Sequence, residues 1–432
     1  MIAIAKRIVK VDNLARVEGE GALTVHLNGR EIESVAFRIF EPPRFFEAFL
    51  RGRQAREAPD ITSRICGICP VAYIASASQA VEAALGVELT PTVRDLRRLL
   101  YCGEWIQSHV LHAAMLHAPD FMGLDNAIQI SMADPALVEK ALRLKKLGNT
   151  IMEVIGGRAV HPVNTRIGGF YRLPETERIA ALIPELTWAV DAARELALRF
   201  AGFEFSDDEG DYLFVSLAHP DCYPIEAGRI VSSRGLDIDP AHFEAHFVEE
   251  HVAHSNALHG RMRDGSRYLV GPLARYANNH ARLSAACRQT AHDCGLGPVV
   301  RNGFQSIVVR MIEVQYAAEE ALRLARSYRP AGPAFVEACD RAGEGHGCTE
   351  APRGICYHRY RIDAEGRIED AWIVPPTSQN QPQIEADLAR VVAASLDLDD
   401  DALRHRCEQT IRNYDPCISC ATHFLRLTIV RG

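Results

Sequence analysis

The chain has 432 residues, of which 47% are hydrophobic, 24% charged and 7% aromatic. These proportions are typical of a globular protein, so a disordered, collagenous or coiled-coil chain is excluded. Acidic residues outnumber Lys and Arg by 56 to 48 and no basic run is present, so we expect no nucleic-acid partner.

The sequence has no feature that predicts a membrane span or an export pathway. It contains no stretch of about 18 uncharged apolar residues, the length that a spanning helix needs. The first 21 residues lack an apolar block followed by a small-residue cleavage site. We therefore expect a cytoplasmic protein.

The predicted elements begin with a β-hairpin, in which GALTVHL and EIESVAFRIF flank Asn28-Gly29, a strong turn signal. A second hairpin is predicted at 355–374, and the segment 202–238 is rich in loops with short strand-like pieces. Apolar periodicity and helix-start signals predict helices at 71–86, 90–117, 134–156, 176–202, 272–292, 303–328 and 380–412. The predicted fold is mainly α with small β elements (α+β), one helical body that spans 1–432 as a single domain.

Four of the twelve cysteines form two Cys-x-x-Cys pairs, Cys66 with Cys69 and Cys417 with Cys420. We read the other eight as small buried apolar residues. Paired cysteines are typical of structural zinc, but zinc ribbons place the pairs about 15–20 residues apart, whereas 348 positions separate Cys69 from Cys417. A redox dithiol needs only one pair. Thiolates also suit nickel, iron–sulfur clusters and copper(I), so the ligand type leaves open a catalytic metal centre built from both chain ends.

The sequences around these pairs, RICGICP at 64–70 and DPCISCATH at 415–423, resemble the first and last motifs of the [NiFe]-hydrogenase large subunit. The resemblance covers essentially the whole chain. It extends to RVEG at 16–19, SH at 108–109, DF at 120–121, GGR at 156–158, HP at 161–162, GG at 168–169, EAPRG at 350–354 and VPPT at 374–377.

The resemblance implies a nickel–iron centre. Nickel would be held by all four thiolates, and Cys69 and Cys420 would share their sulfurs with iron, while Cys66 and Cys417 would be terminal nickel ligands. In the family the iron also carries carbon monoxide and cyanide. No side chain supplies these ligands, so maturation proteins are implied as partners.

The resemblance also assigns residues around the metals. Four thiolates and two cyanides carry six negative charges, whereas two divalent metals carry four positive charges. The centre would therefore be a buried dianion, which requires a nearby cation. Arg353 would lie over the open metal position, oriented by Asp415, with Pro352 shaping the pocket roof. Thr377 would donate a hydrogen bond to a cyanide ligand.

Two further functions are implied for residues near the chain ends. Glu18 matches the family glutamate that receives a proton from the terminal nickel thiolate, Cys417. Glu47, the main-chain carbonyl near Trp372 and His423 would hold a magnesium or similar ion, mostly through water.

Three positions depart from the pattern of many members. Tyr73 replaces the histidine of Cys-x-x-Cys-x-x-x-His, Glu20 stands where a histidine often follows the relay glutamate, and Ser108 precedes His109 where uptake-type members often have aspartate. These departures favour the cytoplasmic, cofactor-coupled branches. Residues 424–432 match the tail that a dedicated C-terminal protease commonly removes after nickel insertion.

The predicted function is therefore the catalytic large subunit of a [NiFe]-hydrogenase, which interconverts H2 with two protons and two electrons. The chain has no motif for an iron–sulfur cluster or a flavin, so an iron–sulfur small subunit is expected. The expected acceptor is NAD(P), reached through flavin-bearing diaphorase subunits. The alternatives are an H2-sensing homologue, a non-hydrogenase relative of the quinone-site subunit of complex I, and a zinc-stapled helical protein.

Overall fold

A computed structural model describes residues 6–422 of the chain. The strands are β1 (Lys6–Val11), β2 (Gly21–Asn28), β3 (Glu31–Ile39), β4 (Thr165–Arg166), β5 (Gly169–Phe170), β6 (Val215–Ala218), β7 (Arg229–Ser232), β8 (Asp237–Ile238), β9 (Phe247–Val252), β10 (Ser255–Met262), β11 (Gly343–Ala351), β12 (Gly354–Ile362) and β13 (Ile368–Val374). The α-helices are α1 (Phe46–Leu50), α2 (Ala58–Ser63), α3 (Pro70–Leu85), α4 (Pro91–Val110), α5 (Ala118–Met122), α6 (Ala127–Ala133), α7 (Pro135–Gly156), α8 (Thr176–Ala180), α9 (Ile183–Ala201), α10 (Phe243–His246), α11 (Pro272–Asn279), α12 (Ala285–Asp293), α13 (Ser306–Ser327), α14 (Pro376–Ala394), α15 (Asp400–Arg412) and α16 (Ile418–Ala421).

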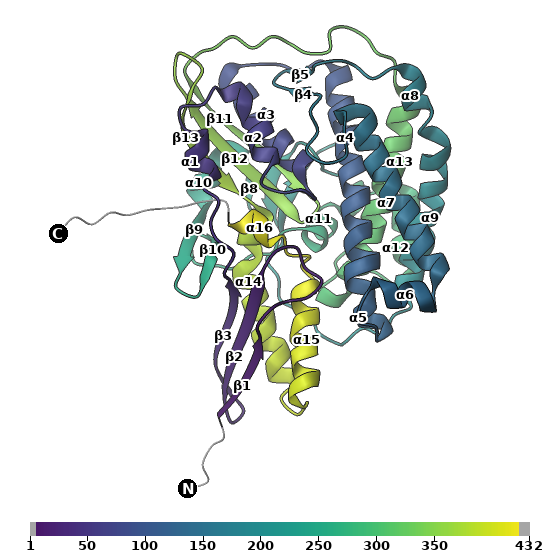
Figure 1. Cartoon of the computed structure of the whole chain (residues 1–432), viewed down its shortest axis with the longest axis vertical. Coiled ribbons are helices and arrows are strands. Elements are labelled where there is room, and N and C mark those ends of the chain that lie inside the picture. The colour runs from purple at the N-terminus through teal and green to yellow at the C-terminus, as the bar shows by residue number, and fades with distance from the viewer. Residues whose placement is uncertain (1–5, 423–432) are drawn as a thin grey trace, which may run out of the picture.

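Long helices form one side of the molecule, where α4, α7, α9 and α13 pack along one another (Figure 1). Helix α4 is capped by Thr90, whose hydroxyl accepts from Val93 N, and is followed by a π-helical segment, Leu111–His117. Helices α4 and α7 approach closely at two glycines, since a Cβ atom on Gly148 would lie 2.6 Å from Gly103 O. The long helices thus form a closely packed layer beside the centre of the molecule.

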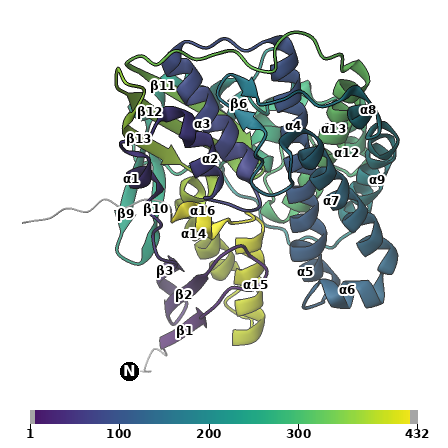
Figure 2. The same cartoon turned by 45° about the horizontal axis from the view of Figure 1, so that its top comes forward.

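A three-stranded antiparallel sheet, β11-β12-β13, lies on the other side and carries helix α3 (Figure 2). Alternate glycines of β11 face this helix: a Cβ atom on Gly345 would lie 2.0 Å from Ala80 O, and one on Gly347 2.1 Å from Ser76 O. Only glycine permits this approach of backbone to backbone. The close packing fixes the middle of α3 against β11.

The N-terminal sheet, β1-β2-β3, packs against α14, and β1 also contacts α15, so both ends of the chain meet. Helix α16 lies at this junction (Figure 1). The described part of the chain contains no helix that is both long and apolar enough to cross a bilayer.

The predicted fold class is confirmed: the chain is mainly helical with small sheets, and it brings cysteines from both ends together. Both predicted hairpins are present as β2–β3 and β12–β13, although each belongs to a three-stranded sheet. Three predicted helices are each interrupted. The predicted helix at 176–202 forms α8 and α9, that at 272–292 forms α11 and α12, and that at 380–412 forms α14 and α15.

Candidate metal centre

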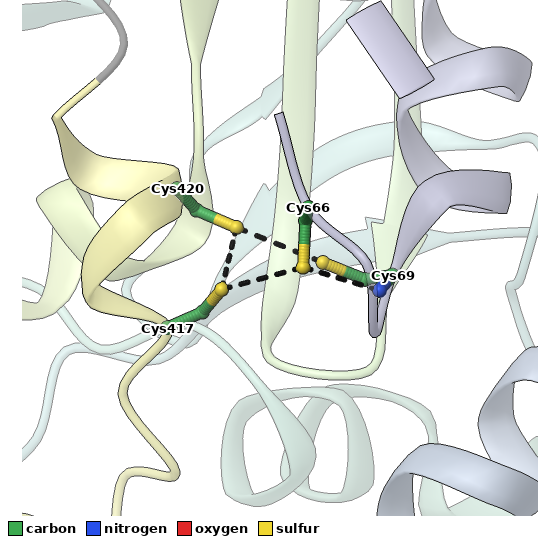
Figure 3. Close-up of side chains that lie close together, drawn as sticks. All are labelled: Cys66, Cys69, Cys417 and Cys420. Carbon is green, nitrogen blue, oxygen red and sulfur yellow. Dashed lines mark hydrogen bonds between the residues drawn. The ribbon is translucent and has the colours of Figure 1, made fainter. Parts of the chain in front are cut away.

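The four predicted cysteines form one buried cluster. Their sulfur atoms lie within 4.8 Å of one another, and each residue is at most 3% exposed. Cys66 and Cys69 come from the loop that precedes α3, Cys417 and Cys420 from the first turn of α16, and the side chains point toward one another (Figure 3). The Sγ–Sγ distances are 3.5 Å for Cys66–Cys417, 3.7 Å for Cys69–Cys420 and 2.6 Å for Cys417–Cys420.

The chemistry of this cluster fits a soft metal. Burial raises the pKa of the Cys417 and Cys420 thiols, because each thiolate would be a buried anion beside other sulfurs. The raised pKa favours the protonated thiols. A bound metal cation reverses this preference, since it stabilises the deprotonated ligands. Four buried thiolates at these separations can surround one ion and share sulfurs with a second, so the donor set fits a nickel–iron pair.

The first cysteine pair is held by two residues of α4 that the sequence reasoning missed. Glu104 is fully buried and accepts hydrogen bonds from Val71 N at 2.6 Å and Ala72 N at 3.1 Å, at the start of α3. Gln107 donates to Ile68 O, between the two cysteines, at 2.6 Å. Burial raises the pKa of Glu104 well above its usual value. The sequence does contain a signal for this role, because Glu104 is a charged residue within an otherwise apolar helical stretch.

Arg44 connects the two cysteine motifs and was also missed. Its guanidinium Nη2 donates to Ile65 O at 2.7 Å and to Ser419 O, and its main-chain N donates to Thr422 O at 2.8 Å. One side chain therefore bonds both ends of the chain beside the sulfurs.

The predicted pair of Arg353 and Asp415 is present at the cluster. Arg353 is 3% exposed and donates from Nε to Asp415 O at 2.6 Å and from Nη2 to Asp415 Oδ1 at 3.1 Å. Its third nitrogen, Nη1, is buried and has no hydrogen-bond partner within residues 6–422. Burial opposes the charged form, but Asp415 and the nearby thiols of Cys417, Cys69 and Cys66 outweigh it and raise the Arg353 pKa. Arg353 thus remains a cation with one nitrogen available.

The loop that carries Arg353 is anchored by Arg275, a fully buried residue that the sequence reasoning did not single out. Arg275 donates to Ala351 O at 2.7 Å, Pro352 O at 2.8 Å and Glu350 Oε2 at 2.8 Å, and binds Glu313 through two bonds. Burial raises the pKa of Glu350 to about 7. At Glu313 burial acts in the same direction, but the two bonds from Arg275 outweigh it and lower the pKa to about 2. Pro352, the predicted roof residue, is therefore fixed through its carbonyl.

Thr377 and Glu18 both bond the main chain of the second cysteine motif. Thr377 Oγ1 accepts from Cys417 N at 3.0 Å, which leaves its hydroxyl proton available to an acceptor. The Glu18 carbonyl accepts from Ile418 N, and its carboxylate Oε2 accepts from Ser419 N, both at 3.0 Å. The predicted relay carboxylate is thus half-buried next to the motif that carries Cys417.

Two of the three predicted magnesium ligands lie side by side. Glu47 Oε1 accepts from Ile373 N at 2.9 Å, and Ile373 follows Trp372 in β13. Glu47 and Trp372 line one surface cavity of about 310 Å³. The third predicted ligand, His423, and the tail 424–432 lie outside the described residues.

The three departures from the family pattern differ in their surroundings. Tyr73 lies on α3, one turn after Cys69, and its buried hydroxyl has no hydrogen-bond partner in the described part of the chain. Ser108 is fully buried on α4, whereas Glu20 is exposed. His109, beside Ser108, contacts Glu313 Oε2 at 3.0 Å and belongs to the buried Arg275 network.

Comparisons with known proteins agree with this geometry. The family profile for nickel-dependent hydrogenase matches residues 44–141 and 260–423. Sulfhydrogenase 1 subunit alpha of Pyrococcus furiosus is 32% identical over 428 residues, which cover 97% of this chain and 98% of that protein. The beta subunit of the NAD-reducing hydrogenase HoxS of Cupriavidus necator is 28% identical, over 97% and 95%.

A crystal structure of an NAD+-reducing [NiFe]-hydrogenase in the H2-reduced state superposes with a TM-score of 0.86 at 26% identity, covering 96% of this chain and 99% of that one. A second solved structure, the [NiFeSe]-hydrogenase of Desulfomicrobium baculatum, gives 0.78 at 21% identity and shows the shared fold. The four clustered cysteines, the family match and the full-length relatives lead to one conclusion: the chain belongs to the nickel-dependent hydrogenase family, as a large subunit of the [NiFe] type.

Proposed function

We propose that this chain is the catalytic large subunit of an enzyme that interconverts H2 with two protons and two electrons. The observation that carries the proposal is the buried cluster of four thiols with Arg353 beside it. A nickel–iron centre with carbon monoxide and cyanide on the iron would supply the site of H2 cleavage when bound by Cys66, Cys69, Cys417 and Cys420.

The surrounding residues would compensate the negative charge of this site. The guanidinium cation of Arg353 is buried in a water-poor pocket, where electrostatic stabilisation is strong. Its Nη1 remains free to donate a hydrogen bond. The Thr377 hydroxyl already accepts from Cys417 N, so its proton is available to a cyanide. Asp415 orients Arg353 through both its carbonyl and its carboxylate.

Glu18 would carry protons between the site and the surface. Its carboxylate bonds Ser419 N, two residues from Cys417, and the residue is partly exposed. A carboxyl group in this place can accept a proton on the thiolate side and release it toward solvent. The same relay would serve both directions of the reaction.

Electrons would leave through an iron–sulfur small subunit, and NAD(P) would be the final acceptor, reached through flavin-bearing diaphorase subunits in the cytoplasm. The HoxS relative and the NAD+-reducing structural neighbour support this acceptor. Other relatives are named sulfhydrogenases and F420-non-reducing hydrogenases, and these names do not include NAD(P). We also propose a magnesium ion near Glu47, and maturation proteins with a C-terminal protease as partners.

The test is a metal analysis with an infrared spectrum of the purified protein. We expect one nickel and one iron per chain in the centre, with infrared bands of carbon monoxide and cyanide, and H2-dependent reduction of an artificial dye. A four-cysteine site that contains zinc and gives neither set of bands would overturn the proposal. H2-dependent reduction of NAD+ and NADP+ by the complete complex tests the acceptor separately.

A further inference from the structure

A second group of metal-binding side chains lies apart from the cysteine cluster. His254 stands in the turn between β9 and β10, His259 lies in β10, and Glu385 lies on α14. One ligand atom from each residue falls within 4.8 Å of the others. His254 Nε2 lies 2.6 Å from Glu385 Oε1, and His259 Nδ1 lies 4.0 Å from Glu385 Oε2. The two imidazole rings are 5.5 Å apart and nearly perpendicular.

The three side chains differ in their exposure to solvent. The His259 side chain is 2% exposed, that of Glu385 18% and that of His254 33%. Nε2 of His259 is buried and has no hydrogen-bond partner within residues 6–422. Phe37 N donates to Glu385 Oε1 at 3.0 Å, so strand β3 fixes the carboxylate. An ion could enter from the side of His254 and reach a ligand set that is already held in place.

The ligand types and distances suit zinc. Zinc binds imidazole nitrogen at about 2.0–2.1 Å and carboxylate oxygen at about 2.0–2.2 Å in a tetrahedron, which separates ligand atoms by about 3.3 Å. The distance of 2.6 Å is that of a hydrogen bond, in which a proton occupies the place of the ion. For Zn²⁺ to replace this proton, the distance from His254 to Glu385 must open from 2.6 Å and the distance from His259 to Glu385 must close from 4.0 Å. The ligand atoms of the two imidazoles must also approach, from a separation of at most 4.8 Å.

Arg261 is a positive charge that acts on both His259 and Glu385. Arg261, two residues after His259 in β10, contacts Glu250 Oε2 at 3.4 Å and donates to Gly265 O. Its charge is therefore partly compensated by Glu250 on the neighbouring strand.

We propose that His254, His259 and Glu385 bind one Zn²⁺ ion, with water at the fourth position on the exposed side. The ion would join the β9–β10 hairpin to α14, the helix that begins at Pro376 and whose Thr377 bonds Cys417 N. This site uses nitrogen and oxygen ligands, so it differs chemically from the four-sulfur cluster and does not depend on the proposed hydrogenase function.

The test uses the assembled enzyme, in which nickel and iron already occupy the cysteines. After treatment with a chelator, the protein is equilibrated with ZnCl2, and bound zinc is counted and examined by X-ray absorption. We expect one zinc per chain with nitrogen and oxygen neighbours at about 2.0–2.2 Å, because sulfur neighbours would lie at about 2.3 Å.

Variants then assign the ligands. Glu385→Gln and His254→Ala should each weaken zinc binding by more than about tenfold, since even residues that only orient a zinc ligand contribute 10–100-fold. His292→Ala is the matched control, because its imidazole lies 3.8 Å from Asp293 on the surface and should leave zinc binding unchanged. The thermal unfolding midpoint measured without zinc, unchanged in both variants, verifies that they are folded whether or not the chain oxidises H2. Zinc bound only through sulfur, no zinc at all, or full zinc affinity in folded Glu385→Gln would overturn the proposal.

Discussion

Replacing Arg353 by Lys tests whether the guanidinium contributes more than its charge. Arg353 uses Nε and Nη2 to bond Asp415, and Nη1 stays unpartnered in the described structure. Lysine keeps the positive charge, but its three N–H donors share one nitrogen. It cannot reproduce the planar fork that bonds both the carbonyl and the carboxylate of Asp415 and holds Nη1 as a separate donor toward the open metal position. Because the charge is kept, nickel and iron content should stay close to wild type.

The expected loss of activity follows from this geometry. Removal of one preorganised donor costs about 10²–10³ in turnover, or about 2.7–4 kcal/mol of transition-state stabilisation. The assay is H2-dependent dye reduction, expressed per bound nickel. Arg64→Lys is the control: it lies beside Cys66 in sequence, but its ion pair with Asp60 is exposed, so turnover should not change. Turnover of Arg353→Lys within about threefold of wild type would refute a donor role for Arg353.

The remaining predictions concern the ligands, the relay and a buried carboxyl group. Cys417→Ser replaces a soft thiolate by a hard oxygen, so nickel content and H2 evolution should both be lost; stoichiometric nickel with normal evolution would contradict the assignment. Glu18→Gln should keep its metals but lose H2 oxidation, H2 evolution and exchange of deuterium gas with solvent protons; normal exchange per nickel would reduce Glu18 to a packing residue. The raised pKa of Glu350, about 7, means that its stabilising contribution is complete below about pH 4.5 and is lost as the pH rises through 7. The free energy of unfolding should therefore fall by up to about 3 kcal/mol between pH 4.5 and 8, and urea titrations of Glu350→Gln should lack this part of the slope.

The sequence predicts those parts of the site that are local in the chain. Cys66, Cys69, Cys417 and Cys420 are recognisable from spacing, and the resemblance placed Arg353 beside Asp415, where the structure has it. The helix break before α15 also had a local signal, since the Asp399 side chain accepts from Ala402 N as a helix cap. The apolar periodicity on both sides of this cap nevertheless predicts one continuous helix over 380–412.

Other parts depend on contacts between distant residues, which no local pattern contains. Arg275 and Arg44 are ordinary arginines in sequence, and their importance arises from carbonyl groups that the fold brings within reach. Strand β11 was missed because its glycines, such as Gly345 and Gly347, are unfavourable in isolated strands. Their presence is explained only by the backbone of α3, which lies directly against them.

The meeting of the two chain ends has a consequence for biosynthesis. Cys66 precedes Cys417 by 351 residues. At a synthesis rate of about 5–20 residues per second, roughly 20 to 70 s pass between the appearance of the first pair and that of the second. During this interval Cys66 and Cys69 are a bare dithiol, and copper and zinc compete well for thiolates. The order of translation alone therefore requires that something other than the finished pocket keep foreign ions from the ribosome-bound chain.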